Sequence, residues 1–185
     1  MIETTIKGID LKFYTSQKIF SPKKIDNGTL AMLSMADFEH GDKVLDLGCG
    51  YGVVGILAAK LIGDKNVVMS DISEEAIELS KKNAALNGVD VKLCLSDGFK
   101  SIIDKDFTHI LTNPPYHVDF KVPKLFIEKG FNRLKIGGKM YMVTKRKEWY
   151  KNKMISIFGG VKIWEINGYY VFMSEKRDSS YAKHR

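Results

Sequence analysis

The sequence has few cysteines, and this excludes some ways of stabilising a small protein. Only two of the 185 residues are Cys, Cys49 and Cys94, and neither has a CxxC partner or a His at ligand spacing. Neither a disulfide framework nor a zinc site is therefore indicated. We expect no metal, and we expect both cysteines to be small buried residues.

Long apolar runs are also missing. No stretch approaches the roughly 18 apolar residues that a membrane span needs, and the N-terminal segment MIETTIKGIDLKFY lacks a basic region followed by an apolar one. We therefore expect a cytoplasmic protein without a membrane partner. At 185 residues, 44% of them hydrophobic, the chain is long enough for one domain with a sizeable core and too short for two.

Negative charge is scarce in one part of the chain. The formal net charge is +7, but residues 118–153 alone carry eleven Lys and Arg against three Asp and Glu, a net charge of +8. A basic surface over Lys121–Lys153 favours RNA as a partner, because Lys and Arg that meet phosphates release counterions. The alternative is a set of solvated helix faces, since only four of the 29 basic residues are Arg.

Apolar and amphipathic segments alternate regularly along the chain. The pattern predicts strands at 43–47, 66–71, 91–97, 107–113, 139–144, 161–166 and 169–175, and helices at 53–62, 73–88, 121–134 and 147–158. Strands that alternate with helices form a parallel sheet with helices on both faces. Asn167-Gly168 is typical of a hairpin turn, so the last strand should be antiparallel. The sequence therefore predicts an α/β fold with a Rossmann-like, seven-stranded, mostly parallel sheet.

A glycine-rich loop, LDLGCGYGVVG at 45–55, joins the first strand to the first helix. Three of its glycines fit the GxGxxG pattern, so a nicotinamide oxidoreductase has to be considered. That pattern seats a pyrophosphate on the helix N-terminus, where the carboxylate of Asp46 would repel phosphate. S-adenosylmethionine carries a sulfonium and an ammonium but no phosphate, and Gly48, Gly50 and Gly52 would let the backbone come close to its methionine portion.

Acidic or amide residues end four of the predicted strands: Asp46, Asp71, Asp97 and Asn113. The carboxyl ends of parallel strands meet at one edge of the sheet, where ligands of this fold class bind. A single Asp after a strand is usually a turn former, but three in series with a glycine loop indicate a binding site. We expect Asp71 to accept from both ribose hydroxyls and Asp97, followed by Gly98, to accept from the adenine amine.

Two of the four prolines stand together in the motif NPPY, which runs from Asn113 to Tyr116. Proline fixes its own φ and holds the preceding residue extended, so the motif offers acceptors in a stiff backbone. The Asn113 side-chain oxygen and the Pro114 carbonyl should accept the N–H bonds of a conjugated amine and turn its lone pair toward a methyl donor. Tyr116 would stack on the base. We therefore assign Asn113, Pro114, Pro115 and Tyr116 to catalysis, and leave His117 unassigned.

In this order and spacing, DLGCGYG, SDIS, LSDGF and NPPY resemble the motifs of class I S-adenosylmethionine-dependent methyltransferases. Two more stretches, IFSPKKIDNGTLAML and LKIGGKMYMVTKRKEWY, make the chain similar to the catalytic domain of the C-type guanine-N2 methyltransferases of small-subunit ribosomal RNA. The resemblance covers about residues 11–175. Nothing in the chain corresponds to the additional N-terminal domain of better-known members.

The resemblance implies a single methyltransferase domain over 1–185, with a cofactor-capping segment at 1–40, a Rossmann-like core at 41–175 and a polar, basic tail at 176–185. Phe20, Asp26, Gly28 and Thr29 would lie on a helix or loop that closes over the cofactor. The residues expected to bind S-adenosylmethionine, from the motifs and the resemblance together, are Thr29, Asp46, Gly48, Gly50, Asp71, Ile72, Asp97, Gly98 and Asn113.

The implied activity is methylation of an exocyclic base amine, above all guanine N2 of ribosomal RNA. The motifs leave other functions open. NPPY also serves methylation of a glutamine amide in a protein such as a release factor. It serves DNA adenine methylation too, although no target-recognition domain is visible. A protein that binds S-adenosylmethionine or RNA without catalysis is the alternative from another class.

Overall fold

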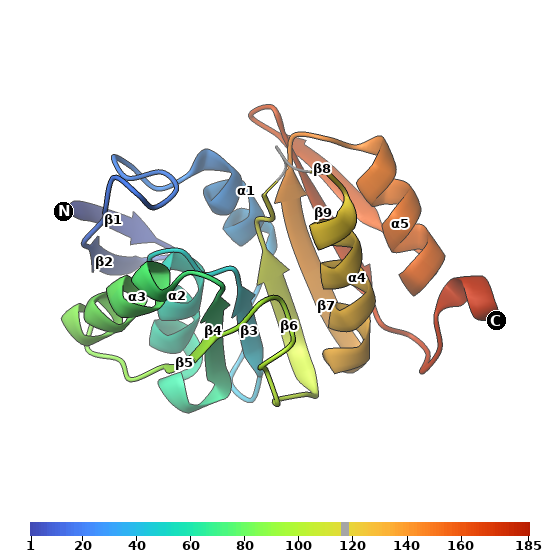
Figure 1. The fold of residues 1–185 in the computed structure, drawn as a ribbon, viewed down its shortest axis with the longest axis horizontal. Helices are drawn as coiled ribbons and strands as arrows, with labels where there is room; N and C mark the ends of the chain where they lie inside the picture. The colour runs from blue at the N-terminus through green and yellow to red at the C-terminus, as the bar shows by residue number, and fades with distance from the viewer. Residues whose placement is uncertain (116–118) are drawn as a thin grey trace.

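The computed structural model describes residues 1–115 and 119–185 (Figure 1). The strands of the main sheet are β3 (Val44–Leu47), β4 (Val67–Asp71), β5 (Lys92–Leu95), β6 (Phe107–Thr112), β7 (Leu134–Thr144), β8 (Lys162–Ile166) and β9 (Tyr169–Glu175). Their order is β5-β4-β3-β6-β7-β9-β8. The first five strands in this order, β5, β4, β3, β6 and β7, pair in parallel. Strand β9 is antiparallel to both β7 and β8. The predicted sheet, with its antiparallel last strand, is confirmed.

Helices cover both faces of this sheet and bury two separate apolar clusters. Helices α1 (Asn27–Met35), α2 (Val53–Ile62) and α3 (Glu74–Leu86) pack on one face, and α4 (Lys121–Arg133) and α5 (Glu148–Phe158) pack on the other. Two short 3₁₀ helices are η1 (Asp64–Asn66) and η2 (Ala182–His184). Within the described part of the chain, no helix is long and apolar enough to cross a membrane.

An N-terminal hairpin, β1 (Ile2–Ile6) and β2 (Ile9–Phe13), forms a second small sheet that the sequence analysis did not predict. Two asparagines of α3 and its C-cap hold the chain there. Asn87 accepts from the Lys12 N–H at 3.0 Å and donates to the Lys12 carbonyl at 2.7 Å. Asn83 does the same for Tyr14, at 2.7 and 2.9 Å. The two amides pair with backbone as a neighbouring strand would, and they hold β2 and the residue after it against α3.

Two expectations from the sequence need correction, the start of one strand and the burial of one cysteine. β7 begins at Leu134 rather than 139, because an irregularity after Leu134 lets the strand pair with β6 in two parts. Glycine is needed there, since a Cβ at Gly138 would lie 2.7 Å from the Phe107 carbonyl oxygen. Cys49 is buried as expected, but Cys94 is only partly buried because β5 is an edge strand.

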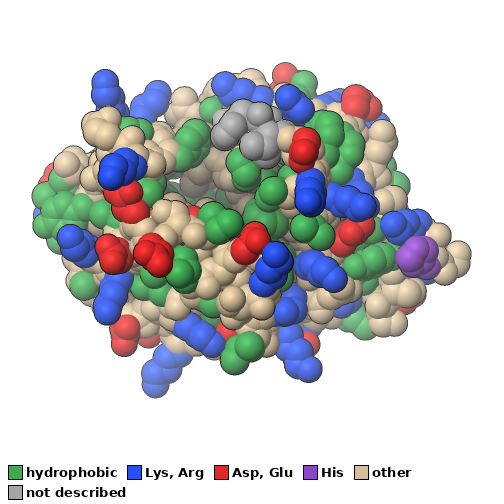
Figure 2. Space-filling view, in the orientation of Figure 1, with side chains coloured by type: hydrophobic (Ala, Val, Ile, Leu, Met, Phe, Trp, Pro, Cys, Tyr) green, Lys and Arg blue, Asp and Glu red, His purple; other side chains and the backbone are tan. Residues whose placement is uncertain are grey.

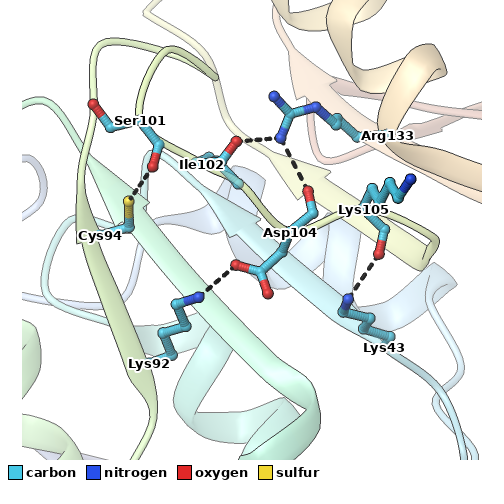
Figure 3. A network of polar contacts seen from close by, with 8 residues as sticks. All are labelled: Lys43, Lys92, Cys94, Ser101, Ile102, Asp104, Lys105 and Arg133. Atoms are coloured by element: carbon cyan, nitrogen blue, oxygen red, sulfur yellow. Dashed lines mark hydrogen bonds and ion pairs between the residues drawn. The ribbon is translucent and has the colours of Figure 1, made fainter.

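The connection between β5 and β6, residues 96–106, contains no α-helix and is held by side chains instead (Figure 3). The Arg133 guanidinium, at the end of α4, donates to the carbonyl oxygens of Ile102 and Asp104. The Asp104 carboxylate in turn pairs with Lys92 Nζ at 2.7 Å. This network fixes the segment that carries Asp97 and Gly98.

Arg133→Ala should lower the free energy of unfolding by about 1–3 kcal/mol, because two carbonyl oxygens lose their donor. Urea unfolding measures the loss. The matched control is Arg177→Ala: Arg177 forms an exposed ion pair with Glu175, and its loss should change stability by no more than about 0.5 kcal/mol. Equal losses for the two variants would show that Arg133 does not hold the 96–106 segment.

Candidate active site

The backbone N–H groups of the glycine loop between β3 and α2 bind the last two residues of the neighbouring strand, β4. The N–H groups of Gly48 and Cys49 donate to the Ser70 carbonyl at 2.9 and 2.8 Å, and the Gly50 N–H donates to the Asp71 carboxylate at 2.9 Å. Gly48 and Gly50 adopt positive φ angles of 75° and 57°, which glycine tolerates best. These three N–H groups are therefore not available to a pyrophosphate.

Asp46 lies beneath this loop and binds the first turn of α2. Its Oδ2 accepts from the Gly55 N–H at 2.8 Å, and only 3% of the residue is exposed. The carboxylate thus occupies the helix N-terminus that would seat a phosphate, which argues against a nicotinamide oxidoreductase. Burial raises the pKa of Asp46 to about 7, against the lowering effect of the Gly55 hydrogen bond and with a further increase from the charge of Asp71.

The next two strand-end carboxylates are more accessible than Asp46. Asp71 accepts from the Gly50 N–H through one oxygen and from the Ser73 N–H, at 3.0 Å, through the other. These bonds fix the orientation of its carboxylate. The side chain of Asp97 is 62% exposed and pairs with Lys100 at 3.0 Å.

These residues surround one cavity of about 480 Å³ at the carboxyl edge of the sheet, and Figure 2 shows the molecule hollowed in the upper part of this face. Its walls include both prolines of the NPPY motif and every residue expected to bind the cofactor: Thr29, Asp46, Gly48, Gly50, Asp71, Ile72, Asp97, Gly98 and Asn113. A volume of this size suits a small organic ligand. The structure thus brings the expected residues together, and their roles in binding remain predictions.

The segment before β3 forms part of the same cavity. Phe20 precedes α1, and Asp26 caps the helix by accepting from the Thr29 N–H at 2.9 Å. All three line the cavity. Gly28 does not: a Cβ there would lie 2.8 Å from the ring of Tyr169, so this glycine lets α1 pack closely against β9.

Two buried hydroxyl groups on the cavity wall were missed by the sequence analysis. Ser70 Oγ and Thr112 Oγ1 have no hydrogen-bond partner among residues 1–115 and 119–185. They flank Leu47 in register on either side of β3, so they face the same side of the sheet. Buried polar groups are normally hydrogen-bonded, so these two hydroxyls are exceptions beside the cavity. A hydroxyl within an apolar strand carries no sequence signal that would have identified them.

The described part of the NPPY motif stands at the end of β6. The Asn113 side-chain Nδ2 donates to Asp26 Oδ2 at 2.9 Å and to Thr29 Oγ1 at 3.3 Å. Pro114 is buried and Pro115 is exposed. Tyr116, like His117, lies outside the described residues, so its stacking on a base remains a prediction.

Three consecutive cations follow β7, and each lies over an aromatic ring. The pairs are Lys145 over Tyr169 at 5.1 Å, Arg146 over Phe120 at 5.4 Å and Lys147 over Tyr170 at 5.8 Å from the ring centroid. We call these six residues the basic–aromatic rim. Its three cations are exposed and lie just beyond the carboxyl end of β7, at the edge of the sheet where β6 ends in Asn113.

The rest of the predicted basic surface is less uniform. Figure 2 shows Lys and Arg side chains spread over α4. Lys153, however, pairs with Glu128 at 2.8 Å, and both side chains are mostly buried. Arg133 is bound to the 96–106 segment. Among the residues that the structure describes, no group of three or more His, Cys, Asp and Glu could hold a metal ion.

The strand order, the antiparallel β9 and the cavity at the carboxyl ends define a Rossmann-like methyltransferase fold. The chain belongs to the methyltransferase small domain family, whose sequence profile matches residues 10–173.

Several relatives share this domain. An uncharacterized Bacillus subtilis protein, YbxB, is 33% identical over 92% of this chain and 89% of its own length. Ribosomal RNA small subunit methyltransferase C of Pseudoalteromonas atlantica is 31% identical over 86% of this chain and 48% of its own length. The solved structure of the Thermus thermophilus 16S rRNA N2 methyltransferase RsmC, in complex with AdoMet and guanosine, matches with a TM-score of 0.87 and 26% identity, over 95% of this chain and 50% of that one. The chain thus spans about half the length of the ribosomal RNA methyltransferases that it matches.

Asp46→Asn should change how stability depends on pH. The pKa of Asp46 is raised in the folded state from 3.8 to about 7, so its favourable contribution is present below about pH 4 and is lost as the pH rises through 7. Asn does not titrate and keeps an acceptor for the Gly55 N–H. As the pH rises from about 4 to 8, the wild type loses this contribution and the variant does not. The free energy of unfolding of the variant should therefore increase relative to that of the wild type over this range.

Urea unfolding at a series of pH values measures this difference. The exposed Asp90→Asn is the control. A stability difference between Asp46→Asn and wild type that does not vary with pH would contradict the assignment.

Proposed function

We propose that the protein is an S-adenosylmethionine-dependent methyltransferase that acts on an exocyclic base amine of RNA, most of all guanine N2 of ribosomal RNA. The observation that carries the proposal is the position of Asn113. Its amide lies on the wall of the cavity that also carries the strand-end carboxylates, and its Nδ2 is bound to Asp26. An amide held by its NH₂ group has its oxygen left to accept a hydrogen bond from a substrate.

The cavity has the chemistry that S-adenosylmethionine needs. Asp46 ionises near neutral pH, so a cationic ligand close to the glycine loop favours its charged form. Asp71 offers an oriented carboxylate to ribose hydroxyls. Ile72 is 69% exposed on the cavity wall, where it can cover a planar base. When bound, the cofactor supplies an electrophilic methyl group, and the electron pair of the broken C–S bond remains on sulfur.

The remaining task of the chain is to make an amine nucleophilic. The lone pair of an exocyclic base amine is delocalised into the ring, so the nitrogen attacks poorly in the plane of the base. Asn113 Oδ1 and the Pro114 carbonyl are acceptors that would bind its two N–H groups and turn the lone pair out of conjugation. The nitrogen becomes acidic as it gains the methyl group, and it then releases one proton to water.

The basic–aromatic rim supports RNA over a glutamine side chain as the substrate. Exposed cations bind phosphates without regard to sequence, and aromatic side chains with Arg above them stack on bases. A base in structured RNA has to leave its stack before its amine can reach Asn113. A rim beside the cavity would bind the nucleotides that flank such a base.

A transfer assay tests the proposal. The purified protein is incubated with methyl-labelled S-adenosylmethionine and, in separate reactions, with unmodified small-subunit ribosomal RNA, the assembled small subunit, or a protein release factor. Label in an N2-methylguanosine supports the proposal. Label only in a glutamine of the release factor would contradict it and support the amide alternative.

Asn113→Ala should lower kcat by about 10²–10³. This is the loss seen when an enzyme loses one oriented group that hydrogen-bonds to the transition state. Because the amide acts on the transition state, kcat and kcat/KM should fall together, while S-adenosylmethionine binding measured by calorimetry stays close to wild type. Asn132→Ala is the control, since Asn132 bonds Tyr181 away from the cavity. Wild-type turnover by Asn113→Ala would exclude the proposed chemistry.

Replacement of the three rim cations, Lys145, Arg146 and Lys147, by Gln should weaken RNA binding and flatten its salt dependence. In a plot of the logarithm of the RNA association constant against the logarithm of the salt concentration, the slope is negative. Its magnitude should decrease by about 1 for each phosphate that the variant no longer binds. Lys65, Lys81 and Lys82, which are exposed on η1 and α3, replaced together by Gln, provide a control of equal charge. If both triple variants keep the wild-type slope, the rim does not contact phosphate.

A further inference from the structure

The amide of Asn113 is held by a carboxylate from a distant part of the chain. Nδ2 donates to Asp26 Oδ2 at 2.9 Å across 87 residues of sequence. The same oxygen accepts from the Thr29 N–H, also at 2.9 Å. The first turn of α1 therefore fixes the position of the carboxylate, and the carboxylate fixes one end of the amide.

An ionised carboxylate only accepts hydrogen bonds, whereas an amide has a donating and an accepting end. If the Asn113 amide turned over, Oδ1 would face Asp26 Oδ2 and two acceptors would repel each other. We infer that Asp26 is a positioning residue that holds Asn113 in the one orientation in which Oδ1 can accept from the substrate amine. This inference rests on the proposed function, because it assigns a role within the same site.

A purely structural role for Asp26 is the alternative. Asp26 caps α1, but a cap needs only an acceptor for the Thr29 N–H, which Ser, Asn and Asp all provide. Ser is one atom shorter than Asp and its hydroxyl can also donate, so it caps the helix without imposing an orientation on Asn113. Asp26→Ser therefore separates capping from positioning.

The charge of Asp26 makes Asn113→Asp informative. Two ionised carboxylates at hydrogen-bond distance repel, and the pair then retains a proton to a higher pH than either carboxylate would alone. With one proton shared, residue 113 donates to Asp26 through O–H and keeps its other oxygen as an acceptor, which reproduces the arrangement of the amide. Without that proton, the two side chains turn apart.

Other ionisable groups surround this pair and have to be allowed for. Those that line the same cavity are Lys18, Asp46, Cys49, Tyr51, Asp71 and Asp97. Tyr169 packs against Gly28 of α1, and Lys145 lies over the Tyr169 ring. Burial, and to a lesser extent the charge of Asp26, raises the pKa of Tyr51 to about 12, so Tyr51 stays neutral. Asp46 titrates near pH 7, but every variant retains it. Rates expressed relative to wild type at each pH therefore cancel its effect.

The experiment compares Asn113→Asp, the double variant Asp26→Asn/Asn113→Asp, and Asp26→Ser with the wild type. At about pH 8, Asn113→Asp should lose about 10²–10³ in kcat, as expected for a misplaced acceptor, and regain at least tenfold as the pH falls to about 5.5. The double variant should recover at least tenfold over Asn113→Asp at about pH 8. Its amide, now at position 26, donates to the carboxylate at position 113 and leaves the second carboxylate oxygen available. Asp26→Ser should lose kcat with wild-type cofactor binding and melting temperature.

A second readout needs no substrate. Repulsion between the two carboxylates raises the pKa of the carboxyl pair in folded Asn113→Asp. The stability that the shared proton provides is therefore present at low pH and is lost as the pH rises. The melting temperature of Asn113→Asp should therefore fall below that of the double variant as the pH rises from about 5.5 to about 8.

The two readouts distinguish a wrong inference from a wrong substrate. If the melting temperatures show the coupling but no RNA is methylated by the wild type, the positioning contact is supported and the proposed substrate is wrong. Equal pH dependence of melting for the single and double variants would overturn the inference. So would a double variant no more active than Asn113→Asp on an RNA that the wild type methylates.

Discussion

The buried hydrogen bond from the Gly55 N–H to the Asp46 carboxylate sets the relation between β3, the glycine loop and α2. It draws the first turn of the helix onto the sheet, where a Cβ on Gly55 would lie 2.3 Å from the Met69 side chain. The loop above it then bonds Ser70 and Asp71 instead of a phosphate. A familiar glycine pattern thus forms a cavity suited to a cation, because one carboxylate takes the position of the anion.

The cavity joins two halves that the chain builds separately. Asp71 at the end of β4 would bind the cofactor, while Asn113, directly after β6, would bind the substrate. Helix α1 connects them, since Asp26 and Thr29 lie on the cavity wall and also bind the Asn113 amide. In the proposed reaction, which depends on positioned acceptors, one edge of the sheet would align the methyl donor with the amine.

Periodicity and turn chemistry predicted the main sheet, because each strand and helix carries its own pattern of apolar residues. The strand-end residues followed from topology, which brings them to one edge. The hairpin β1–β2 and the early start of β7 were missed, since the first depends on amides of α3 and its C-cap, and the second on a local irregularity at Gly138. The Asp26–Asn113 bond was missed for a related reason: a contact between residues 87 positions apart leaves no local pattern. Asp46 was expected to face the ligand, and its burial under the loop could not be read from its position alone.

In the proposed reaction, this cavity and the acceptors of Asn113 and Pro114 together methylate a base amine in RNA. Mass mapping of ribosomal RNA from a strain that lacks the gene tests it most directly, combined with incubation of that RNA, or of the small subunit that contains it, with the purified protein and S-adenosylmethionine. We expect one methylated guanosine to be missing in the strain, and the added protein to restore a single methyl group at the same nucleotide. Identical maps from mutant and parent strains, with no methyl group added in the reaction, would exclude methylation of ribosomal RNA by this protein.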